Sequence, residues 1–312
     1  MSEGHGYGKT ILFGEHFVVY GRPAIASALG SKTTARVERI RAKDYELVDN
    51  RPETPNYKKE KFEEQKKSLE NIFKAMNIDP KKNPLRITFG GDLKAASGVG
   101  ASAASCAALA RALNQEFELG LNDEKINEIA YEGEKGYHGT PSGIDNTAAV
   151  FGGLIWFVKN SEGGPNTMDR LNLKKPVEIV LGNTGITSST TEVVGDVKKA
   201  KEENPEKFER IFDEYNKLVN AAKSSLLKFD LKKTGELMDK NHELLQEIGV
   251  SCDELELLVN TARESGAFGA KLTGTGRGGL MIALTPGEEL QNRVAEAIED
   301  EGFSALKTRI GV

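Results

Sequence analysis

The feature that most limits how this chain can fold is a strand-like segment that leads through a glycine-rich loop into an alanine-rich helix. Residues 85–89 resemble a strand, residues 102–113 a buried helix, and the loop between them reads Ser97-Gly98-Val99-Gly100-Ala101-Ser102. A helix start presents unpaired N–H groups and the positive end of its dipole, and small residues let the backbone close on a phosphate. No Gly-Lys-Ser/Thr ends the loop, so it is not a Walker loop. The pattern predicts either a phosphate site, with the Ser102 hydroxyl near a phosphate-bound metal ion, or a tight strand-to-helix turn.

Strand-like and helical segments alternate on both sides of this loop. In the first half we predict strands at residues 11–20 and 34–38, helices at residues 59–76 and 123–135, and one or two strands within residues 148–158. In the second half we predict strands at residues 177–181, 271–273, 280–284 and 305–310, and helices after Asn204-Pro205, at residues 230–248, from a Ser251/Glu254 capping box to near Gly266, and at residues 288–301. These segments predict two α+β domains, residues 1–172 and 173–312, joined near residues 165–176.

Composition and charge exclude several classes of protein. The 312 residues are 38% apolar and 29% charged, with a formal net charge of −5, which is the balance of a soluble globular protein. Nothing indicates a nucleic-acid surface, the apolar runs are far shorter than a membrane span, and the N-terminus lacks the features of a signal peptide. Cys106 and Cys252 have neither metal-ligand nor disulfide spacing, so we expect two reduced thiols in a cytoplasmic protein.

Three further segments combine glycines with polar side chains. Residues 132–146 hold Glu134 and Asp145 among many turn-forming residues, and a kinase uses such acids for Mg²⁺ and beside the attacking hydroxyl. Residues 8–21 place Lys9, Glu15 and His16 in an apolar run, where charges need partners. Residues 271–279 carry four glycines between strand-like segments, which indicates close backbone approach. Taken singly, these segments are also compatible with a solvated surface loop, a structural ion pair and a flexible hairpin, respectively.

In this order along the chain, the four segments resemble the GHMP kinase superfamily and, more narrowly, its mevalonate kinases. Residues 8–21, with Gly14-Glu15-His16, are similar to the first motif, residues 98–104 to the phosphate-binding motif and residues 271–279 to the third motif. The run His138-Gly139-Thr140-Pro141-Ser142-Gly143-Ile144-Asp145-Asn146 resembles the mevalonate kinase form of the second segment. The resemblance spans nearly the whole chain and is nearest to trypanosomatid-like members, including the start Gly6-Tyr7-Gly8-Lys9.

The resemblance implies a fold, an activity and a set of partners. The implied fold is the two-domain α+β GHMP kinase fold, with an N-terminal ATP-binding domain like domain 2 of ribosomal protein S5 and a ferredoxin-like C-terminal domain. The implied activity moves the γ-phosphoryl group of ATP, with Mg²⁺, to the primary (C5) hydroxyl of mevalonate, giving 5-phosphomevalonate for isoprenoid biosynthesis. Expected partners are mevalonate and ATP, not nucleic acid or a membrane, and a homodimer is left open.

The resemblance also implies roles for matching positions. Asp145 would act at the mevalonate hydroxyl as base or electrostatic orienter, and Lys9 beside it would stabilise the developing alkoxide. Ser102 and Glu134 would bind Mg²⁺. The mevalonate pocket would be lined by Lys9, Glu15, His16, Asp145 and Thr190. The triphosphate would lie on the loop and helix start formed by Ser97, Gly98, Val99, Gly100, Ala101, Ser102 and Ala103, with residues 274–278 supporting the site.

The chain departs from the family pattern at several positions. Gly6-Tyr7 replaces the usual Ala-Pro, Ala101 replaces a serine of the phosphate loop, and Ser188 stands near Thr190 where animal-type enzymes carry an arginine. Thr275 and Arg277 replace small residues of the third motif, and Arg277 could add a phosphate contact or point to solvent.

Three alternatives are weighed against the proposed activity. One is another GHMP enzyme, acting on phosphomevalonate, homoserine, diphosphomevalonate or the 3-hydroxyl of mevalonate. The second is a non-catalytic ligand sensor, which should have lost Lys9, Glu134 or Asp145. The third is a Rossmann dehydrogenase, which needs a third loop glycine where Ala103 stands and an acid near Leu119.

Overall fold

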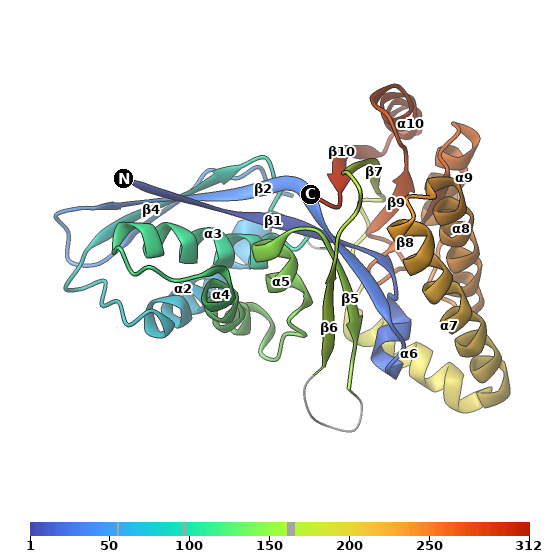
Figure 1. Ribbon diagram of the computed structural model, residues 1–312, viewed down its shortest axis with the longest axis horizontal. Helices are drawn as coiled ribbons and strands as arrows, with labels where there is room; N and C mark the ends of the chain where they lie inside the picture. The colour runs from blue at the N-terminus through green and yellow to red at the C-terminus, as the bar shows by residue number, and fades with distance from the viewer. Residues whose placement is uncertain (55, 96–97, 161–165) are drawn as a thin grey trace. The chain divides into compact units, whose positions relative to one another are not determined.

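The computed structural model describes residues 1–54, 56–95, 98–160 and 166–312 (Figure 1). The chain forms two compact units: the first unit consists of Met1–Lys9 and Ala28–Gly152, and the second of Thr10–Ser27 and Gly153–Val312. Strands β1 (Ser2–Phe13) and β2 (Ala24–Arg39) therefore contribute residues to both units. The division of the chain at residue 172 stays a prediction.

The first unit packs helices against a small sheet. Its strands follow the order β3 (Glu46–Asp49), β4 (Leu85–Gly91), β2, and β1 also pairs with β2. Strand β4 is antiparallel to β2 and parallel to β3. The helices are α1 (Tyr57–Glu60), α2 (Phe62–Ala75), α3 (Ala101–Glu116), α4 (Asp123–His138) and α5 (Ile144–Phe151). Figure 1 shows α2, α3 and α4 on one side of these strands, and the apolar core between the two layers includes Val37, Ile87, Leu69 and Ile129.

Glycines on one face of β1 allow α3 to lie directly on that strand. A Cβ atom built on Gly4 would lie 2.3 Å from the Ala108 carbonyl oxygen, and one built on Gly6 would lie 2.3 Å from the Ala104 carbonyl oxygen. Both distances are far below van der Waals contact, so only glycine fits at either position. Because α3 presents alanines to β1, strand and helix backbones approach closely, and this contact fixes where α3 begins.

The second unit contains an antiparallel sheet in the order β10 (Ser304–Ile310), β7 (Val177–Asn183), β9 (Leu280–Leu284), β8 (Gly269–Thr273). A hairpin of β5 (Leu154–Val158) and β6 (Thr167–Leu171) pairs with residues 24–27 of β2. The helices are α6 (Thr190–Glu203), α7 (Pro205–Leu227), α8 (Leu231–Glu247), α9 (Asp253–Glu264) and α10 (Glu288–Asp300). Helix α7 starts at Pro205, as expected for a proline at a first helical position.

A short 3₁₀ helix, η1 (His16–Tyr20), is fixed to α7 by aromatic packing. The ring of Phe17 stacks on Tyr215 with 3.9 Å between centroids, and its edge meets Phe212 at 6.2 Å. The Tyr215 hydroxyl donates to the Pro23 carbonyl at 2.8 Å. Such aromatic pairs contribute about 1 kcal/mol each beyond the area they bury. This cluster therefore holds the residues that precede η1 in a defined place in the second unit.

Most predicted elements are confirmed, but three predictions were wrong. The strand expected at residues 11–20 ends at Phe13, because Gly14, with a φ of 117°, turns the chain into η1. Residues 148–151, expected to be strand, complete α5, and the strand starts at Leu154. The Ser251/Glu254 capping box does not form: Cys252 precedes α9, and the Ser251 hydroxyl donates to Glu256 instead.

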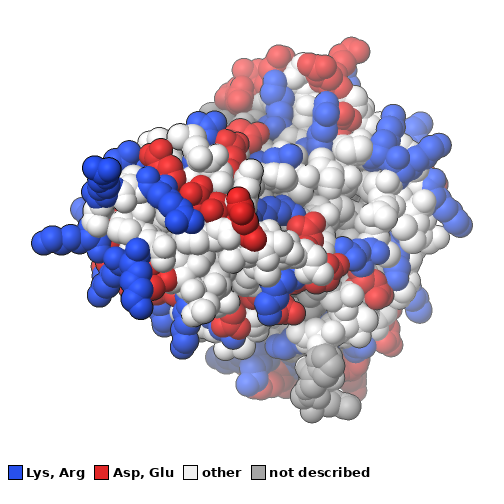
Figure 2. Space-filling view, turned by 60° about the vertical axis from the view of Figure 1, so that its left-hand side comes forward, with Lys and Arg blue, Asp and Glu red and all other residues white. Residues whose placement is uncertain are grey.

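The face of the molecule in Figure 2 carries side chains of both charges. Figure 2 shows Lys and Arg interspersed with Asp and Glu on the face that it displays, in line with a net charge of only −5. Among the described residues, no helix combines the length and apolar character that crossing a membrane requires.

Candidate active site

Lys9 and Asp145 form an ion pair in the first unit. The Lys9 Nζ atom lies 3.0 Å from Asp145 Oδ1, and the two side chains are 12% and 29% exposed. Lys9 comes from β1 and Asp145 from the first turn of α5. The backbone N–H of Lys9 also donates to the Val99 carbonyl at 2.8 Å, which ties this part of β1 to the glycine-rich loop. The ion pair therefore lies beside the loop, and both partners are only partly shielded from solvent.

The glycine-rich loop presents backbone rather than side chains. Gly98 and Gly100 take positive φ angles of 86° and 68°, and a Cβ on Gly100 would lie 3.0 Å from Lys9 Cβ. Ala101 and Ala103 are buried in the first turn of α3, and Val99 is 4% exposed. Ser97 lies outside the described residues. The start of α3 presents its unpaired N–H groups here, which suit an anion, and Ser102 offers a hydroxyl beside them.

Glu134 is a buried acid beside Ser102. It lies in α4 and is 1% exposed, and its Oε1 atom has no hydrogen-bond partner among the described residues. Burial and the negative charge of Asp145 raise the pKa of Glu134 to about 8, while a hydrogen bond from Ser102 and the charge of Lys9 act in the opposite direction. The Ser102 hydroxyl lies 3.4 Å from His138 Nε2. A bound cation close to the unpartnered Oε1 atom would stabilise the ionised form of Glu134.

A cavity of about 250 Å³ opens beside these residues. Its lining includes Glu134, His138, Ser142, Asp145 and Asn146, which come from α4, α5 and the loop between them. Turn-forming residues of that loop hold the two acids toward one space, as the sequence predicted. No group of three or more His, Cys, Asp or Glu suited to a metal ion occurs in the described part of the chain. A cation here would therefore rely on few protein ligands, as Mg²⁺ held together with a substrate phosphate does.

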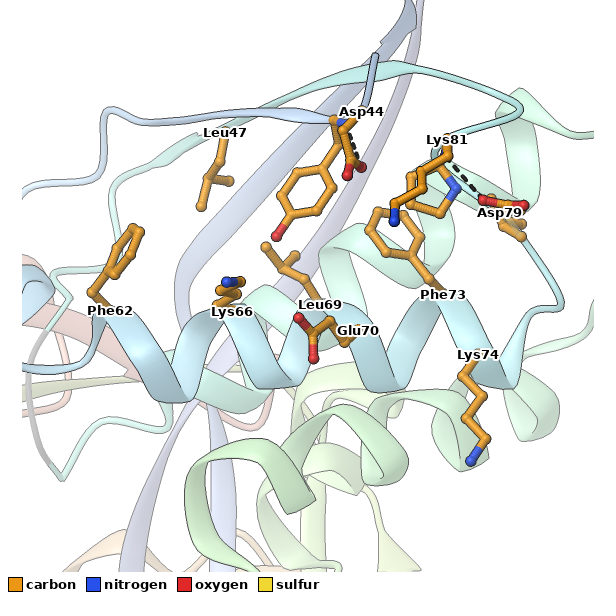
Figure 3. A pocket seen from close by; sticks show the side chains of 13 residues that line it. Asp44, Leu47, Phe62, Lys66, Leu69, Glu70, Phe73, Lys74, Asp79 and Lys81 are labelled. Carbon is orange, nitrogen blue, oxygen red and sulfur yellow. Dashed lines mark hydrogen bonds between the residues drawn. The ribbon is translucent and has the colours of Figure 1, made fainter.

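A larger cavity in the first unit lies apart from the predicted site residues. It measures about 860 Å³ and lies between α2 and β3, where Leu47, Lys66, Leu69, Glu70 and Phe73 are among the residues that line it (Figure 3). None of the site residues predicted from the sequence lines it. Because size alone does not mark a catalytic site, we place the candidate site beside Asp145.

Sequence reasoning missed Arg51, which supports the start of α3. The Arg51 Nη1 atom donates to the Ala101 carbonyl at 3.4 Å and to Ser105 Oγ at 3.1 Å, and Nη2 lies 2.6 Å from Asp49 Oδ2. Burial favours a higher pKa for Asp49, but the hydrogen bonds and charge of Arg51 outweigh it and lower that pKa. Nothing in the sequence pattern of residues 49–57 indicates that Arg51 lies beneath the helix start.

In the second unit, Glu15 and His16 lie at the start of η1. The Glu15 side chain is fully buried and accepts a hydrogen bond from Lys271 in β8, and its Oε2 has no partner among the described residues. His16 Nε2 lies 2.6 Å from the Thr275 carbonyl. A carbonyl only accepts, so Nε2 carries the proton and Nδ1 remains as the acceptor of the neutral ring. Burial lowers the pKa of His16, which favours this neutral form.

The second unit also joins Thr190 to the third glycine-rich segment. Thr190 Oγ1 lies 2.9 Å from Thr275 Oγ1, and Ser188 Oγ donates to the Gly276 carbonyl at 2.6 Å. Arg277, with a φ of 53°, has its Nη1 2.5 Å from Asp196 Oδ2 in α6 and its Nε 3.1 Å from the Gly249 carbonyl. Thr275, Arg277 and Ser188, which depart from the family pattern, all serve to hold the segment before α6 and α6 itself on this loop.

Comparisons with known proteins identify the family. Residues 65–153 match the GHMP kinases N terminal domain, and residues 222–304 match the GHMP kinases C terminal domain. The chain is 35% identical to the mevalonate kinase of Thermococcus sibiricus, covering 97% of this chain and 94% of that one. It is 37% identical to the mevalonate kinase of Pyrococcus horikoshii, covering 97% and 93%. The chain belongs to the mevalonate kinase family.

The fold of this family is confirmed by a solved structure. The crystal structure of L. major mevalonate kinase in complex with R-mevalonate superposes with a TM-score of 0.93 and 38% sequence identity, covering 99% of this chain and 96% of that chain. GHMP kinases use ATP, which agrees with a glycine-rich loop at a helix start. Membership of the mevalonate kinase family therefore confirms the fold class and the kinase activity expected from the four sequence segments.

Proposed function

We propose that this chain transfers the γ-phosphoryl group of ATP to the primary (C5) hydroxyl of mevalonate, giving 5-phosphomevalonate and ADP. The observation that carries the proposal is the Lys9–Asp145 pair, 3.0 Å apart, beside a glycine-rich helix start. The similarity to mevalonate kinases, together with the four motifs in their family order, indicates that the substrate is mevalonate. The product places the chain in the mevalonate route to isoprenoids.

Asp145 and Lys9 act on the nucleophile. The C5 hydroxyl donates to the Asp145 carboxylate, which orients it and takes its proton as the new O–P bond forms. Lys9 stabilises the charge that develops on the attacking oxygen and on the moving phosphoryl group. Phosphoryl transfer depends mainly on positioning and charge stabilisation, so a fixed lysine–carboxylate pair of this kind supplies what the reaction needs.

The loop and α3 hold the nucleotide. Gly98, Val99 and Gly100 offer backbone N–H groups to the phosphates, and the positive end of the α3 dipole faces the same way. Ala101 and Ala103 are buried and have small side chains, so neither covers the backbone N–H groups. Ser97 belongs to the same proposed phosphate loop, although it lies outside the described residues.

The same region fits a magnesium ion. Glu134 has an unpartnered buried oxygen and Ser102 a neighbouring hydroxyl, and hard oxygen donors of this kind suit Mg²⁺. We propose that these two residues hold the ion. Bound there, Mg²⁺ would neutralise phosphate charge.

Glu15, His16 and Thr190, all in the second unit, are the further residues that we propose for mevalonate recognition. Glu15 and His16 contact the substrate, and Thr190 approaches it from the N-terminus of α6. Glu15 Oε2 and the Nδ1 of neutral His16 are acceptors, so both favour hydroxyl groups. A cytoplasmic location and assembly as a homodimer stay predictions.

Incubation of the pure protein with ATP and Mg²⁺ tests the function directly. Mevalonate, phosphomevalonate and homoserine are supplied separately, ADP release is measured, and the product is identified by ³¹P NMR. We expect turnover with mevalonate alone and a phosphorus signal coupled to the C5 methylene protons. Turnover restricted to phosphomevalonate or homoserine would assign the chain to another GHMP activity, and ligand binding without any turnover would favour a sensor.

A further inference from the structure

A buried ion pair in the second unit joins Glu15, which we propose to contact mevalonate, to Lys271, which has no part in the mechanism described so far. The Lys271 side chain is 0% exposed, and so is that of its partner Glu15. Lys271 Nζ donates to Glu15 Oε1 and also to the Leu272 carbonyl at 2.6 Å. Lys271 lies in β8 and Glu15 immediately before η1, so the pair joins two elements far apart in the sequence.

Folding alone does not account for this pair. Removing two charges from water costs about as much as their attraction returns, and apolar residues of similar volume often serve a fold equally well. Burial lowers the pKa of Lys271, whereas the negative charge of Glu15 and its hydrogen bond raise it. Each charge is therefore tolerated only because the other is present.

The pair is also incomplete on one side. Glu15 Oε1 is occupied by Lys271, but Glu15 Oε2 is buried without a hydrogen-bond partner among the described residues. A buried acceptor left unpaired is costly, and a donor from a ligand would satisfy it. An ionised carboxylate accepts only, so this donor must be a hydroxyl or an N–H group and not the carboxylate of a substrate.

A second set of contacts holds the strand next to Lys271. The backbone N–H of Leu272 donates to His242 Nδ1 at 3.2 Å, so the proton of the neutral ring lies on Nε2. His242 Nε2 then donates to Glu256 Oε1 at 3.1 Å. Gln246 donates to the other Glu256 oxygen at 2.6 Å. Leu272 is thus bound through its N–H to this network and through its carbonyl to Lys271, which fixes the lysine head group.

We propose that Lys271 is a positioning residue that holds the Glu15 carboxylate by Oε1 and thereby presents Oε2 to a hydroxyl group of mevalonate. The inference rests on the proposed function. It also assigns the substrate carboxylate to groups other than Glu15. Lys271 itself touches no substrate, because its ammonium group is enclosed by Glu15 and the Leu272 carbonyl.

Three variants test this role: Lys271→Met, Glu15→Gln and the double variant Lys271→Met/Glu15→Gln. For each we measure kcat, KM for mevalonate, KM for ATP and the thermal unfolding midpoint. Loss of one well-placed hydrogen bond to a charged group corresponds to about tenfold or more in binding. We therefore expect KM for mevalonate to rise at least about tenfold in each single variant, with KM for ATP changed less than about twofold.

The double variant separates positioning from a structural role. It has no unpaired buried charge, so its thermal midpoint should exceed that of Lys271→Met, while its KM for mevalonate should stay raised. Because the two residues act as one unit, the loss of mevalonate affinity in the double variant should not exceed the sum of the losses in the two single variants. Lys232→Met, which removes an exposed lysine of α8, is the matched control and should leave every parameter unchanged.

The outcomes are distinct. A Lys271→Met protein that is less stable but has an unchanged KM for mevalonate would overturn the inference and leave the function intact. Recovery of both stability and KM in the double variant would show that the pair is structural only. If Lys271→Met does not fold, the double variant alone decides, since it carries no buried charge. A wild-type protein without activity on mevalonate would overturn the proposed function and this inference with it.

Discussion

The Lys9 ammonium nitrogen lies 3.0 Å from Asp145 Oδ1 in the first unit of the protein. Neither residue belongs to the glycine-rich loop, yet the Lys9 backbone is hydrogen-bonded to Val99 of that loop. A cation, a carboxylate and a helix start thus meet within one unit, and each can be removed separately by mutation.

Replacing Asp145 by asparagine should abolish most catalysis while leaving nucleotide binding largely intact. The amide keeps the shape of the side chain but neither takes a proton nor pairs with Lys9, and a positioned base is worth about 10²–10⁴-fold in rate. Single-turnover phosphorylation of mevalonate measures the loss, and calorimetry with ATP checks binding. Asp123→Asn, at an exposed ion pair with Arg111, is the control. Near-normal turnover of Asp145→Asn would refute the proposed role.

Ser102 and Glu134 should both determine how much Mg²⁺ the enzyme requires. Because both are proposed to bind Mg²⁺, Ser102→Ala and Glu134→Gln should each raise the Mg²⁺ concentration needed for half-maximal rate, by roughly tenfold for a lost charged ligand. Rates are measured across a Mg²⁺ titration at saturating ATP. Glu132→Gln, on the same helix but half-exposed and paired with Lys135, should behave as wild type. An unchanged Mg²⁺ dependence in both test variants would remove these residues from the metal site.

Alanine at Gly6 should destabilise the first unit strongly. Its Cβ would lie 2.3 Å from the Ala104 carbonyl oxygen, so β1 or α3 must move, at a cost of about 2–4 kcal/mol. Gly195→Ala is the counterpart: it lies within α6 with no heavy atom inside 4 Å of its Cβ, and alanine favours a helix by up to about 1 kcal/mol. In urea unfolding, Gly6→Ala should lower the free energy of unfolding and Gly195→Ala should raise it. Equal changes in the two variants would contradict the close β1–α3 packing.

Replacing Arg277 by glycine should destabilise the protein less than replacing it by alanine. Both changes remove the ion pair with Asp196, which is exposed and contributes little. Only glycine accepts a φ of 53° without strain, whereas alanine keeps a cost of about 1 kcal/mol. Thermal unfolding of Arg277→Gly and Arg277→Ala compares the two directly. Alanine as stable as glycine would mean that this backbone angle relaxes when the arginine is lost.

Stability should fall in mild acid because of His242. Burial lowers its pKa from 6.5 to about 4, with opposing contributions from Glu256 and reinforcing ones from Arg263 and Lys271. The folded protein then binds fewer protons at this site than the unfolded chain, so stability present at neutral pH is lost as pH falls from about 6.5 to about 4. The loss is at most about 3 kcal/mol.

Comparison with His242→Gln isolates this contribution. Free energies of unfolding in urea are measured for both proteins at pH 7 and pH 4.5. The drop between the two pH values should be smaller in the variant, whose side chain does not titrate. An equal drop in both proteins would assign the acid sensitivity to other groups.

The helix start at the glycine-rich loop could be predicted because the requirement is local. Glycines at positions 98 and 100, followed by buried alanines, have few other uses than close backbone approach, and the structure gives both glycines positive φ angles. Helices α7 and α8 were equally clear, since their apolar residues recur at helical spacing. The strand predicted at residues 11–20 was misplaced, because β1 runs from Ser2 to Phe13. The turn at Gly14 decides where the strand ends, and hydropathy does not record that turn.

Residues far apart in the sequence were placed only by tertiary structure. The sequence by itself determined which motifs the chain carries, and their order was enough to indicate the family and the reaction. It did not determine that Arg51 lies beneath the start of α3, that Arg277 binds α6, or that Lys271 pairs with Glu15. Those contacts depend on packing between elements 50 to 256 residues apart, and hydropathy and turn patterns report only on near neighbours in the chain. The role of a buried charge can be inferred only when its partner is known, and the tertiary structure determines that partner.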